Sequence, residues 1–291
     1  MDPTSPRRKA VLFLILAATL WSTGGLMIKS TTWEPLAILV GRNIFSSAAL
    51  LLYLRRFPIR WTPWKITAAL CHILTAFLFI SSTKLTTAAN AIFLQYTAPL
   101  YIIPLGYFLL REKPSRTDWV SMLVIFCGMF LFFGDKLSLN GLHGNILAAL
   151  SGLTMALMTV ALRAQKDGTP LESILIGQVF TVIVGFPLIL HESWTLTNSL
   201  IIVYLGVVQI GLAFAFFTSA IKHIPALEAT LISTLEPILN PLWVLLFIGE
   251  KPGLFALIGG LIVLSGIAIN AVSSARTAPP QALEGQPTPT D

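Results

Sequence analysis

The chain has 291 residues, of which 55% are hydrophobic and 11% are charged, and its mean hydropathy is +0.80. Soluble domains carry about a quarter charged residues, because their surface must face water. The composition therefore excludes a soluble enzyme, a disordered chain and a disulfide-stapled scaffold, and it predicts a surface that faces lipid.

The basic residues and the cysteines fit the same prediction. The 19 Lys and Arg residues stand in short groups between apolar stretches, as in the loops of membrane proteins, which argues against a nucleic-acid-binding protein. Cys71 and Cys127 both fall inside apolar runs. We expect them to be small buried apolar side chains rather than parts of a disulfide framework.

Ten apolar runs are long enough to cross the hydrocarbon core of a bilayer as helices. They are Val11–Ile28, Pro35–Leu54, Trp64–Thr83, Ala88–Leu110, Trp119–Phe133, Asn145–Leu162, Leu171–Leu190, Leu200–Ile221, Ala226–Ile248 and Leu254–Val272. The fifth run is short, and its helix is expected to begin near Thr117. Ten-residue segments of alternating polarity are absent, which argues against an outer-membrane barrel.

The loop charges predict the orientation of these spans. Fourteen Lys and Arg residues fall on the side of the N-terminus, against Lys29, Lys84, Lys136 and Lys251 on the other. By the positive-inside rule, both termini are cytoplasmic in a multi-pass protein of the bacterial inner membrane. The basic start followed by an apolar run is also typical of a signal peptide, but nine further spans favour an uncleaved first helix.

The two halves of the chain match each other. At an offset of 138 residues they match without a gap at Phe79 and Phe217, Lys84 and Lys222, Pro99 and Pro237, Glu112–Pro114 and Glu250–Pro252, and Gly128 and Gly266. A looser match at an offset of 136 pairs Arg42 with Gln178. Each half holds five spans, an odd number, so the second half must enter the membrane from the opposite side.

The sequence thus predicts an all-α integral membrane protein with ten transmembrane helices, arranged as two inverted five-helix repeats around a central cavity. We expect a cytoplasmic N-terminal segment (1–9), a first repeat (10–140), a second repeat (141–273) and a disordered cytoplasmic tail (274–291). Inverted repeats hold their ligand near the midplane between the copies, and exchange of their roles gives alternating access.

These features resemble a known family. The five-plus-five repeat, Arg42 in the second span and the Glu-Lys-Pro sequences that close the fourth and ninth spans are similar to the drug/metabolite transporter superfamily, in its EamA-type ten-helix branch. The similarity extends to aromatic amino acid exporters and covers all but the two tails. It implies a cavity lined by helices one to four and six to nine, with helices five and ten peripheral.

Differences between this sequence and related transporter families narrow the range of possible substrates. The first span lacks the acidic residue on which small cation-extruding relatives rely, and the ninth span lacks the basic residue of phosphate-handling relatives. The resemblance therefore implies a secondary transporter that exports small organic metabolites. Amino acids with aromatic or neutral side chains suit an apolar, aromatic cavity with an arginine and a few amides. Other metabolites or drugs are the alternative substrates.

Polar residues within the spans are the candidate substrate-binding residues, because each is costly in hydrocarbon. Arg42 is expected either to bind a substrate carboxylate or to have a structural role, in which it bonds helix-end carbonyls or extends toward the membrane surface. The others are Gln95, Gln178, Ser233, Glu236 and Asn240, of which the last three share one helix face. The alternative for Gln178 is an interhelical hydrogen bond, and for the residues near Pro99 and Pro237 it is a hinge whose polar groups are satisfied internally. Glu236 is also a candidate carrier of a coupling proton.

Aromatic and proline residues complete the predicted site. Trp21 precedes a small, polar patch where a cavity can form, and Phe79, Tyr101 and Phe217 are further candidates, although packing or lipid contact is the alternative. Pro99 and Pro237 are predicted hinges, because proline removes a backbone donor and breaks the helix. His72 is expected to be a satisfied or interfacial histidine.

Missing motifs exclude other functions. The sequence lacks the phosphate-binding loop of ATP-driven pumps and the motifs of metalloproteases and serine hydrolases. We expect no enzymatic activity, metal or cofactor; a membrane-embedded enzyme or lipid-handling protein is the alternative of another class. The expected partners are a small-molecule substrate and the lipid bilayer, in a monomer or a homodimer.

Overall fold

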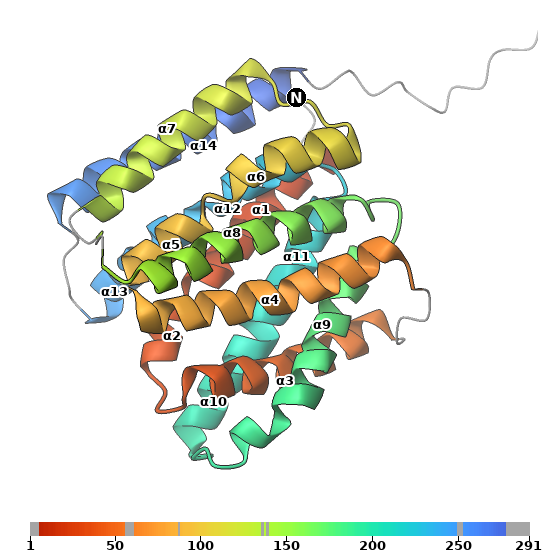
Figure 1. Cartoon of the computed structure of the whole chain (residues 1–291), viewed down its shortest axis with the longest axis vertical. Helices are drawn as coiled ribbons and strands as arrows, with labels where there is room; N and C mark the ends of the chain where they lie inside the picture. The colour runs from red at the N-terminus through yellow and green to blue at the C-terminus, as the bar shows by residue number, and fades with distance from the viewer. Residues whose placement is uncertain are drawn as a thin grey trace, which may run out of the picture.

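The structure is a computed structural model that describes residues 6–55, 61–86, 88–134, 137, 140–248 and 253–277. All regular secondary structure in these ranges is helical (Figure 1). Nine helical segments within them are long and apolar enough to cross a membrane, and the tenth predicted run, 226–248, is helical on both sides of one break. The chain is an all-α integral membrane protein.

The first repeat supplies five spans, three of them single helices. Its elements are α1 (Pro6–Ser22), α2 (Gly24–Lys29), α3 (Pro35–Leu54), α4 (Pro63–Leu85), α5 (Ala88–Gln95), α6 (Ala98–Leu105), the π-helix η1 (Gly106–Leu110) and α7 (Arg116–Phe133). The first span is α1 with α2, and the fourth is α5, α6 and η1. The fifth begins one residue before the expected Thr117.

The second repeat supplies the other five membrane spans. Its elements are α8 (Leu142–Arg163), α9 (Pro170–Gly185), the 3₁₀ turn η3 (Phe186–Ile189), α10 (Leu196–Tyr204), the π-helix η4 (Leu205–Leu212), α11 (Ala213–Ala220), α12 (Ala226–Ser233), α13 (Leu235–Ile248) and α14 (Leu254–Thr277). The tail expected to be disordered is 274–291; residues 274–277 instead belong to α14, and the rest, from 278 onward, lies outside the described residues.

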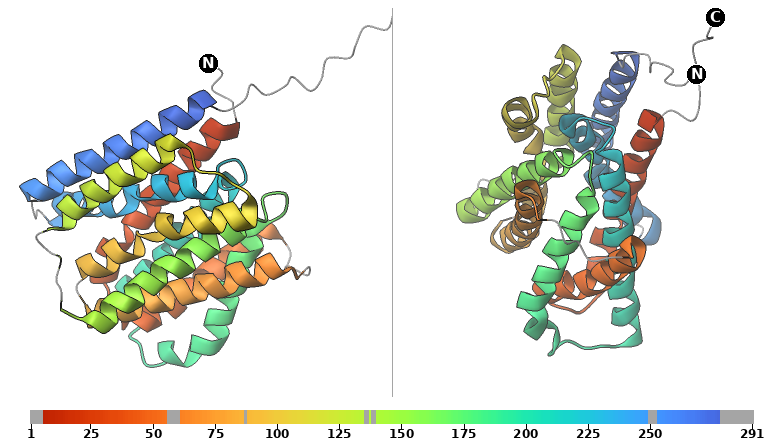
Figure 2. Two further views of the ribbon diagram at one scale, coloured as in Figure 1. Left: turned by 45° about the horizontal axis from the view of Figure 1, so that its top comes forward. Right: turned by 90° about the vertical axis from the view of Figure 1, so that its right-hand side faces the viewer.

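Two groups of helices face each other, and each mixes the two repeats. The α4 group consists of α4, α5, α6 and α8; the α11 group consists of α1, α3, η4, α11, α12 and α13. Helix α9 lies between them and contacts α3, α4 and α11. This interleaving places the seam between the groups inside the molecule (Figure 2).

Helices α7 and α14 pack along one edge of the molecule (Figures 1 and 2). A Cβ atom on Gly128 would lie 2.8 Å from the backbone nitrogen of Val263 and 2.9 Å from the carbonyl oxygen of Gly259. The two backbones touch there, which only glycine permits. On the outer face of α7, Cys127 is exposed, so the prediction that both cysteines are buried is wrong for Cys127 and right for Cys71.

Three spans are interrupted, two of them near their middle. The α5–α6 break falls at Tyr96–Thr97 and the α12–α13 break at Thr234, just before Pro99 and Pro237. Proline has no N–H, and its ring clashes with the carbonyl four residues earlier, so both breaks follow from the sequence. They fall at equivalent positions of the two repeats. The α1–α2 break at Thr23 has no proline.

Candidate functional site

The two proline-associated breaks meet at Tyr96. Its buried hydroxyl donates a 2.7 Å hydrogen bond to Oε2 of Glu236, which directly precedes Pro237. In a regular helix the N–H of residue 237 would bond the carbonyl oxygen of Ser233, but Pro237 has no N–H. That carbonyl oxygen lies 3.4 Å from the Tyr96 hydroxyl. Tyr96 therefore links the α4 group to the α11 group at mid-span and lies against the backbone group that the break leaves open.

Arg42 brings a positive charge to the same region. Its guanidinium on α3 lies close enough to Glu236 and to His72 for electrostatic interaction. The Nε atom has no hydrogen-bond partner among the described residues. Arg42 and Glu236 both lie within their spans and are only partly exposed, where an ionised side chain is costly without a charged partner or a ligand.

Four rings form an aromatic wall beside these charges. The Trp21 ring centroid lies 5.2 Å from that of Phe214 and 5.4 Å from that of Phe217. His72 meets Phe214 edge-on, with centroids 5.0 Å apart. These are favourable aromatic geometries, and they join α1, α4 and α11.

The break in the first span is stabilised by side chains from the eighth and ninth spans. Gln209 of the π-helix donates a 3.2 Å hydrogen bond to the carbonyl of Trp21, and the indole of Trp243 donates 2.7 Å to the hydroxyl of Ser22. A Cβ atom on Gly24 would lie 2.7 Å from the Gln209 amide nitrogen. Tertiary contacts and a close backbone approach therefore take the place of a proline. Irregular helical segments of this kind are frequent at functional sites.

Gln178 on α9 is the repeat counterpart of Arg42. Its side chain is fully buried, and neither its amide nitrogen nor its amide oxygen has a hydrogen-bond partner among the described residues. A buried unpaired amide costs stability, so its presence in a packed helix requires an explanation beyond packing.

The predicted residues divide into two sets. Trp21, Arg42, Phe217, Ser233 and Glu236 come together at the seam between the groups. The remaining candidates lie apart from that cluster or are not described, as the following contacts show.

Gln95 points to α8, where its amide donates a 2.7 Å hydrogen bond to the hydroxyl of Ser151. Phe79 and Tyr101 are half-buried on α4 and α6, and neither has a ring contact with the aromatic wall among the described residues. Asn240 lies on α13, and its side chain falls outside the part of the chain that the structure describes.

Sequence reasoning gave too little weight to Tyr96, His72 and Phe214. Tyr96 stands three residues before Pro99, at the repeat position of Thr234, which marks it as part of the break. His72 is expected to be either satisfied or interfacial; it is buried in the middle of α4 and contacts Phe214, so the interfacial alternative is excluded. The position of His72, far from both ends of the span, was the feature of the sequence that could have predicted a buried histidine.

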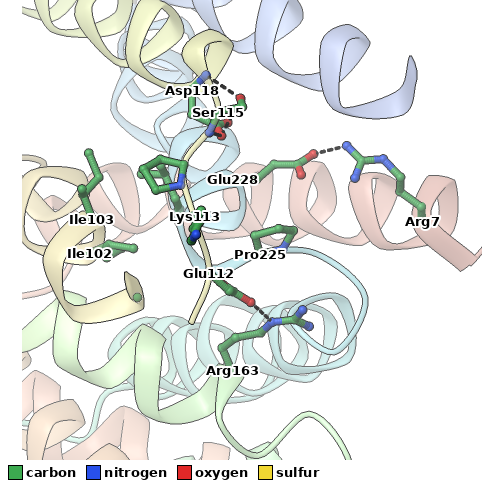
Figure 3. A pocket seen from close by; sticks show the side chains of 13 residues that line it. Arg7, Ile102, Ile103, Glu112, Lys113, Ser115, Asp118, Arg163, Pro225 and Glu228 are labelled. Carbon is green, nitrogen blue, oxygen red and sulfur yellow. Dashed lines mark hydrogen bonds and ion pairs between the residues drawn. The ribbon is translucent and has the colours of Figure 1, made fainter. Parts of the chain in front are cut away.

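A second charged region lies at the face of the molecule where α1 begins, here called the N-terminal face. A pocket of about 460 Å³ lies there. Figure 3 shows two of its acidic side chains paired with arginines, Glu112 with Arg163 and Glu228 with Arg7. Its lining residues also include Ile102, Ile103, Lys113, Ser115, Asp118 and Pro225.

Ten spans in two inverted repeats, with opposite charges and aromatic rings where the two groups of helices meet, define a membrane transporter of the inverted-repeat class. A family model described as the EamA-like transporter family matches residues 8–134 and again residues 142–272. The chain belongs to this family, and it contains the family's domain twice.

Relatives of similar length support this assignment. The chain is 24% identical to an uncharacterized transporter from Clostridium kluyveri, over 92% of this chain and 94% of that protein. It is 25% identical to the uncharacterized transporter YwfM from Bacillus subtilis, over 89% and 92% of the two chains. A protein of known crystal structure has the same fold, with a TM-score of 0.80, 22% identity and coverage of 93% and 99%.

Proposed function

We propose that this transporter exports small zwitterionic metabolites, foremost amino acids with aromatic or neutral side chains, by alternating access at the seam between the α4 and α11 groups. The observation that carries this proposal is that Arg42 and Glu236 lie close enough for electrostatic interaction, next to the aromatic wall of Trp21, Phe214, Phe217 and His72. A zwitterion needs both charges at once, and an apolar side chain needs the rings.

Each part of such a substrate has a complement. The Arg42 guanidinium suits a carboxylate, which it can bind through two parallel hydrogen bonds. The Glu236 carboxylate suits an ammonium group, and the rings of Trp21, Phe214 and Phe217 suit a flat or branched apolar side chain. Binding of the substrate's opposite charges also offsets the free-energy cost of keeping two ionised side chains within the membrane.

The wider set of predicted residues remains part of the proposal. Gln178 offers an amide with free donors and an acceptor, which a bound substrate would satisfy. We propose additional lining roles for Phe79, Gln95, Tyr101, Ser233 and Asn240. Pro99 and Pro237 are proposed hinges, because the helices are already interrupted just before them.

Substrate binding and opening are linked in this scheme through Glu236. Its carboxylate bonds Tyr96 across the seam, and a substrate ammonium competes for the same oxygen atoms. Binding therefore weakens the link between the groups, and the difference in contacts between the empty and loaded states favours the exchange of access. Glu236 is also the proposed carrier of a proton if transport is proton-coupled.

The proposed setting is the bacterial inner membrane with both termini in the cytoplasm, which the excess of loop Lys and Arg residues on the N-terminal face supports. We propose repeats at 10–140 and 141–273 between two cytoplasmic end segments, in a monomer or homodimer.

Counterflow with purified protein tests the function. Vesicles holding only this protein are preloaded with unlabelled phenylalanine or leucine, and uptake of the labelled amino acid is followed. We expect transient accumulation that is strongly reduced, at substrate concentrations near the KM of the unchanged protein, in Arg42→Gln and Glu236→Gln. Folded, correctly inserted protein that exchanges no amino acid would overturn the substrate class, and a screen of metabolites exported from overproducing cells would then replace it.

A further inference from the structure

The Glu112 carboxylate at the N-terminal face connects three elements. Its Oε1 accepts a 2.7 Å hydrogen bond from Nε of Arg163 at the end of α8 (Figure 3). Its Oε2 accepts a 3.2 Å bond from the backbone N–H of Ala226 at the start of α12. A carboxylate at a helix N-terminus also interacts favourably with the helix dipole.

Arg163 completes the connection from its other side. Its Nη1 donates hydrogen bonds of 2.8 Å to the carbonyl of Ile221 and 2.7 Å to the carbonyl of Lys222, directly after α11. These carbonyls belong to a helix end that has no further helical donors, so the guanidinium satisfies them. One ion pair therefore holds the turn between α11 and α12 by both of its helix ends.

The backbone places Glu112 for this contact. Arg111 adopts a left-handed conformation with φ of 59°, and the N–H of Glu112 bonds back to the carbonyl of Gly106 at 3.1 Å. This is a helix C-cap that turns the chain sharply. The carboxylate is thus carried on the end of the fourth span, and it does not depend on a free loop.

The pair lies across the seam between the two groups. Glu112 and Arg163 follow helices of the α4 group, whereas Ile221, Lys222 and Ala226 belong to the turn that joins α11 to α12 in the α11 group. The side chains of Arg163 and Glu112 are 14% and 24% exposed. Partly buried charge-assisted bonds of this kind are worth more than exposed ones.

Tyr96 and the Glu112–Arg163 pair lie at the same boundary between the α4 group and the α11 group. The fourth span carries Tyr96 at its break and Glu112 just past its end, and both residues bond the α11 group. The α4 and α11 groups cannot separate at the N-terminal face while Glu112 and Arg163 hold the turn after α11.

We propose that Glu112 and Arg163 form a gate at the N-terminal face, closed in this structure, which comes apart whenever the site opens to that side. The inference rests on the proposed alternating access, and it adds the residues that control one of the two openings. It also gives the first Glu-Lys-Pro sequence a function beyond marking the repeat. The competing explanation is a fixed staple that holds the fold together and never opens.

Chemical labelling separates the two explanations. The reporter is Ile102→Cys in a background with Cys71→Ala and Cys127→Ala, because Ile102 lines the pocket and is only 2% exposed. A membrane-impermeant maleimide is applied to the N-terminal face in vesicles of known orientation, and the rate of labelling is measured. We expect Glu112→Gln and Arg163→Gln to raise the rate about tenfold, the size expected for losing a charge-assisted bond.

Two further variants sharpen the comparison. Lys113→Gln removes a charge from the same pocket without touching the pair, and we expect the rate of the background. Arg163→Lys keeps the charge but loses the planar fork that bonds Glu112 and two carbonyls together, so we expect an intermediate rate. Monodisperse size-exclusion profiles establish that each variant is folded.

Labelling at the background rate in folded Glu112→Gln and Arg163→Gln, or an equal rise in Lys113→Gln, would overturn the gate. Unfolded Gln variants combined with a background rate in folded Arg163→Lys would do the same and would favour the staple. The labelling requires no transported substrate, so an increase without amino-acid counterflow would retain the gate and reject only the proposed substrate.

Discussion

Tyr96 and Glu236 are hydrogen-bonded at 2.7 Å, and each stands beside the break of its own span. The two breaks occupy equivalent positions in the two repeats, so the bond joins the copies close to the axis that relates them. It also joins the α4 group to the α11 group, which makes it the mid-span counterpart of the contacts at Glu112.

Tyr96→Phe removes this bond while it keeps the ring. We expect a loss of about 1–3 kcal/mol in stability, because the Glu236 carboxylate and the Ser233 carbonyl both lose their donor. Thermal unfolding of the purified protein measures the effect. Tyr101→Phe is the matched control, since the Tyr101 hydroxyl has no hydrogen bond in the described part of the chain. Equal unfolding temperatures for the two variants would contradict the role of Tyr96.

Arg42→Gln tests the carboxylate site. We expect KM for an amino acid to rise about 10- to 100-fold, with a smaller rise for Arg42→Lys, because lysine keeps the charge without the two-pronged geometry. The corresponding amine without a carboxylate serves as the comparison substrate, and its transport should respond much less. The same loss for both substrates would show that Arg42 acts only on the fold.

Trp21→Ala tests the aromatic wall. We expect folded protein whose transport rate for phenylalanine falls about tenfold, and Trp21→Phe should retain much of the rate, because the ring supplies area and geometry. Trp119→Ala is the control, because Trp119 is 49% exposed near the end of its span. Normal rates in Trp21→Ala would mean that the substrate lies elsewhere.

Gln178→Leu separates stability from function. Its amide has no partner among the described residues, so an apolar side chain of similar size should leave the unfolding temperature unchanged or raise it. If the amide bonds the substrate, transport should fall in the same variant. A lower unfolding temperature would show that the amide is paired in the protein.

Gly128→Ala tests the contact of α7 with α14. The added methyl group meets backbone atoms at 2.8–2.9 Å, and we expect destabilisation of about 1–3 kcal/mol with an unchanged transport rate per folded molecule. Gly134→Ala adds the same group where nothing lies within 4 Å, and it should be neutral. Reduced turnover in folded Gly128→Ala would place this edge in the transport mechanism.

Much of the fold could be predicted because the bilayer leaves few alternatives. Each span must be an apolar run of sufficient length, and the breaks at Tyr96 and Thr234 follow from Pro99 and Pro237. The break at Thr23 could not be predicted in this way. It depends on Gln209 and Trp243, which are distant in sequence, and periodicity contains no information about such contacts.

The site was less predictable than the fold. Arg42 and Glu236 were candidates by their cost in hydrocarbon, but their proximity is a tertiary fact. Gln95 shows the opposite case: it has the same chemistry as Gln178, yet Ser151 satisfies it from α8. Only the packing of helices decides which buried amides are already paired.

The break at Thr23 also makes the two copies unequal. The first span is divided into α1 and α2, whereas its counterpart α8 runs unbroken from Leu142 to Arg163. In a transporter with two unlike halves, the inward-open and outward-open states differ in free energy and therefore in population. The apparent affinity for substrate should then differ between the two sides of the membrane. For uncoupled flux, equal concentrations must give no net movement. Any such difference in KM must then be matched by a proportional difference in maximal rate.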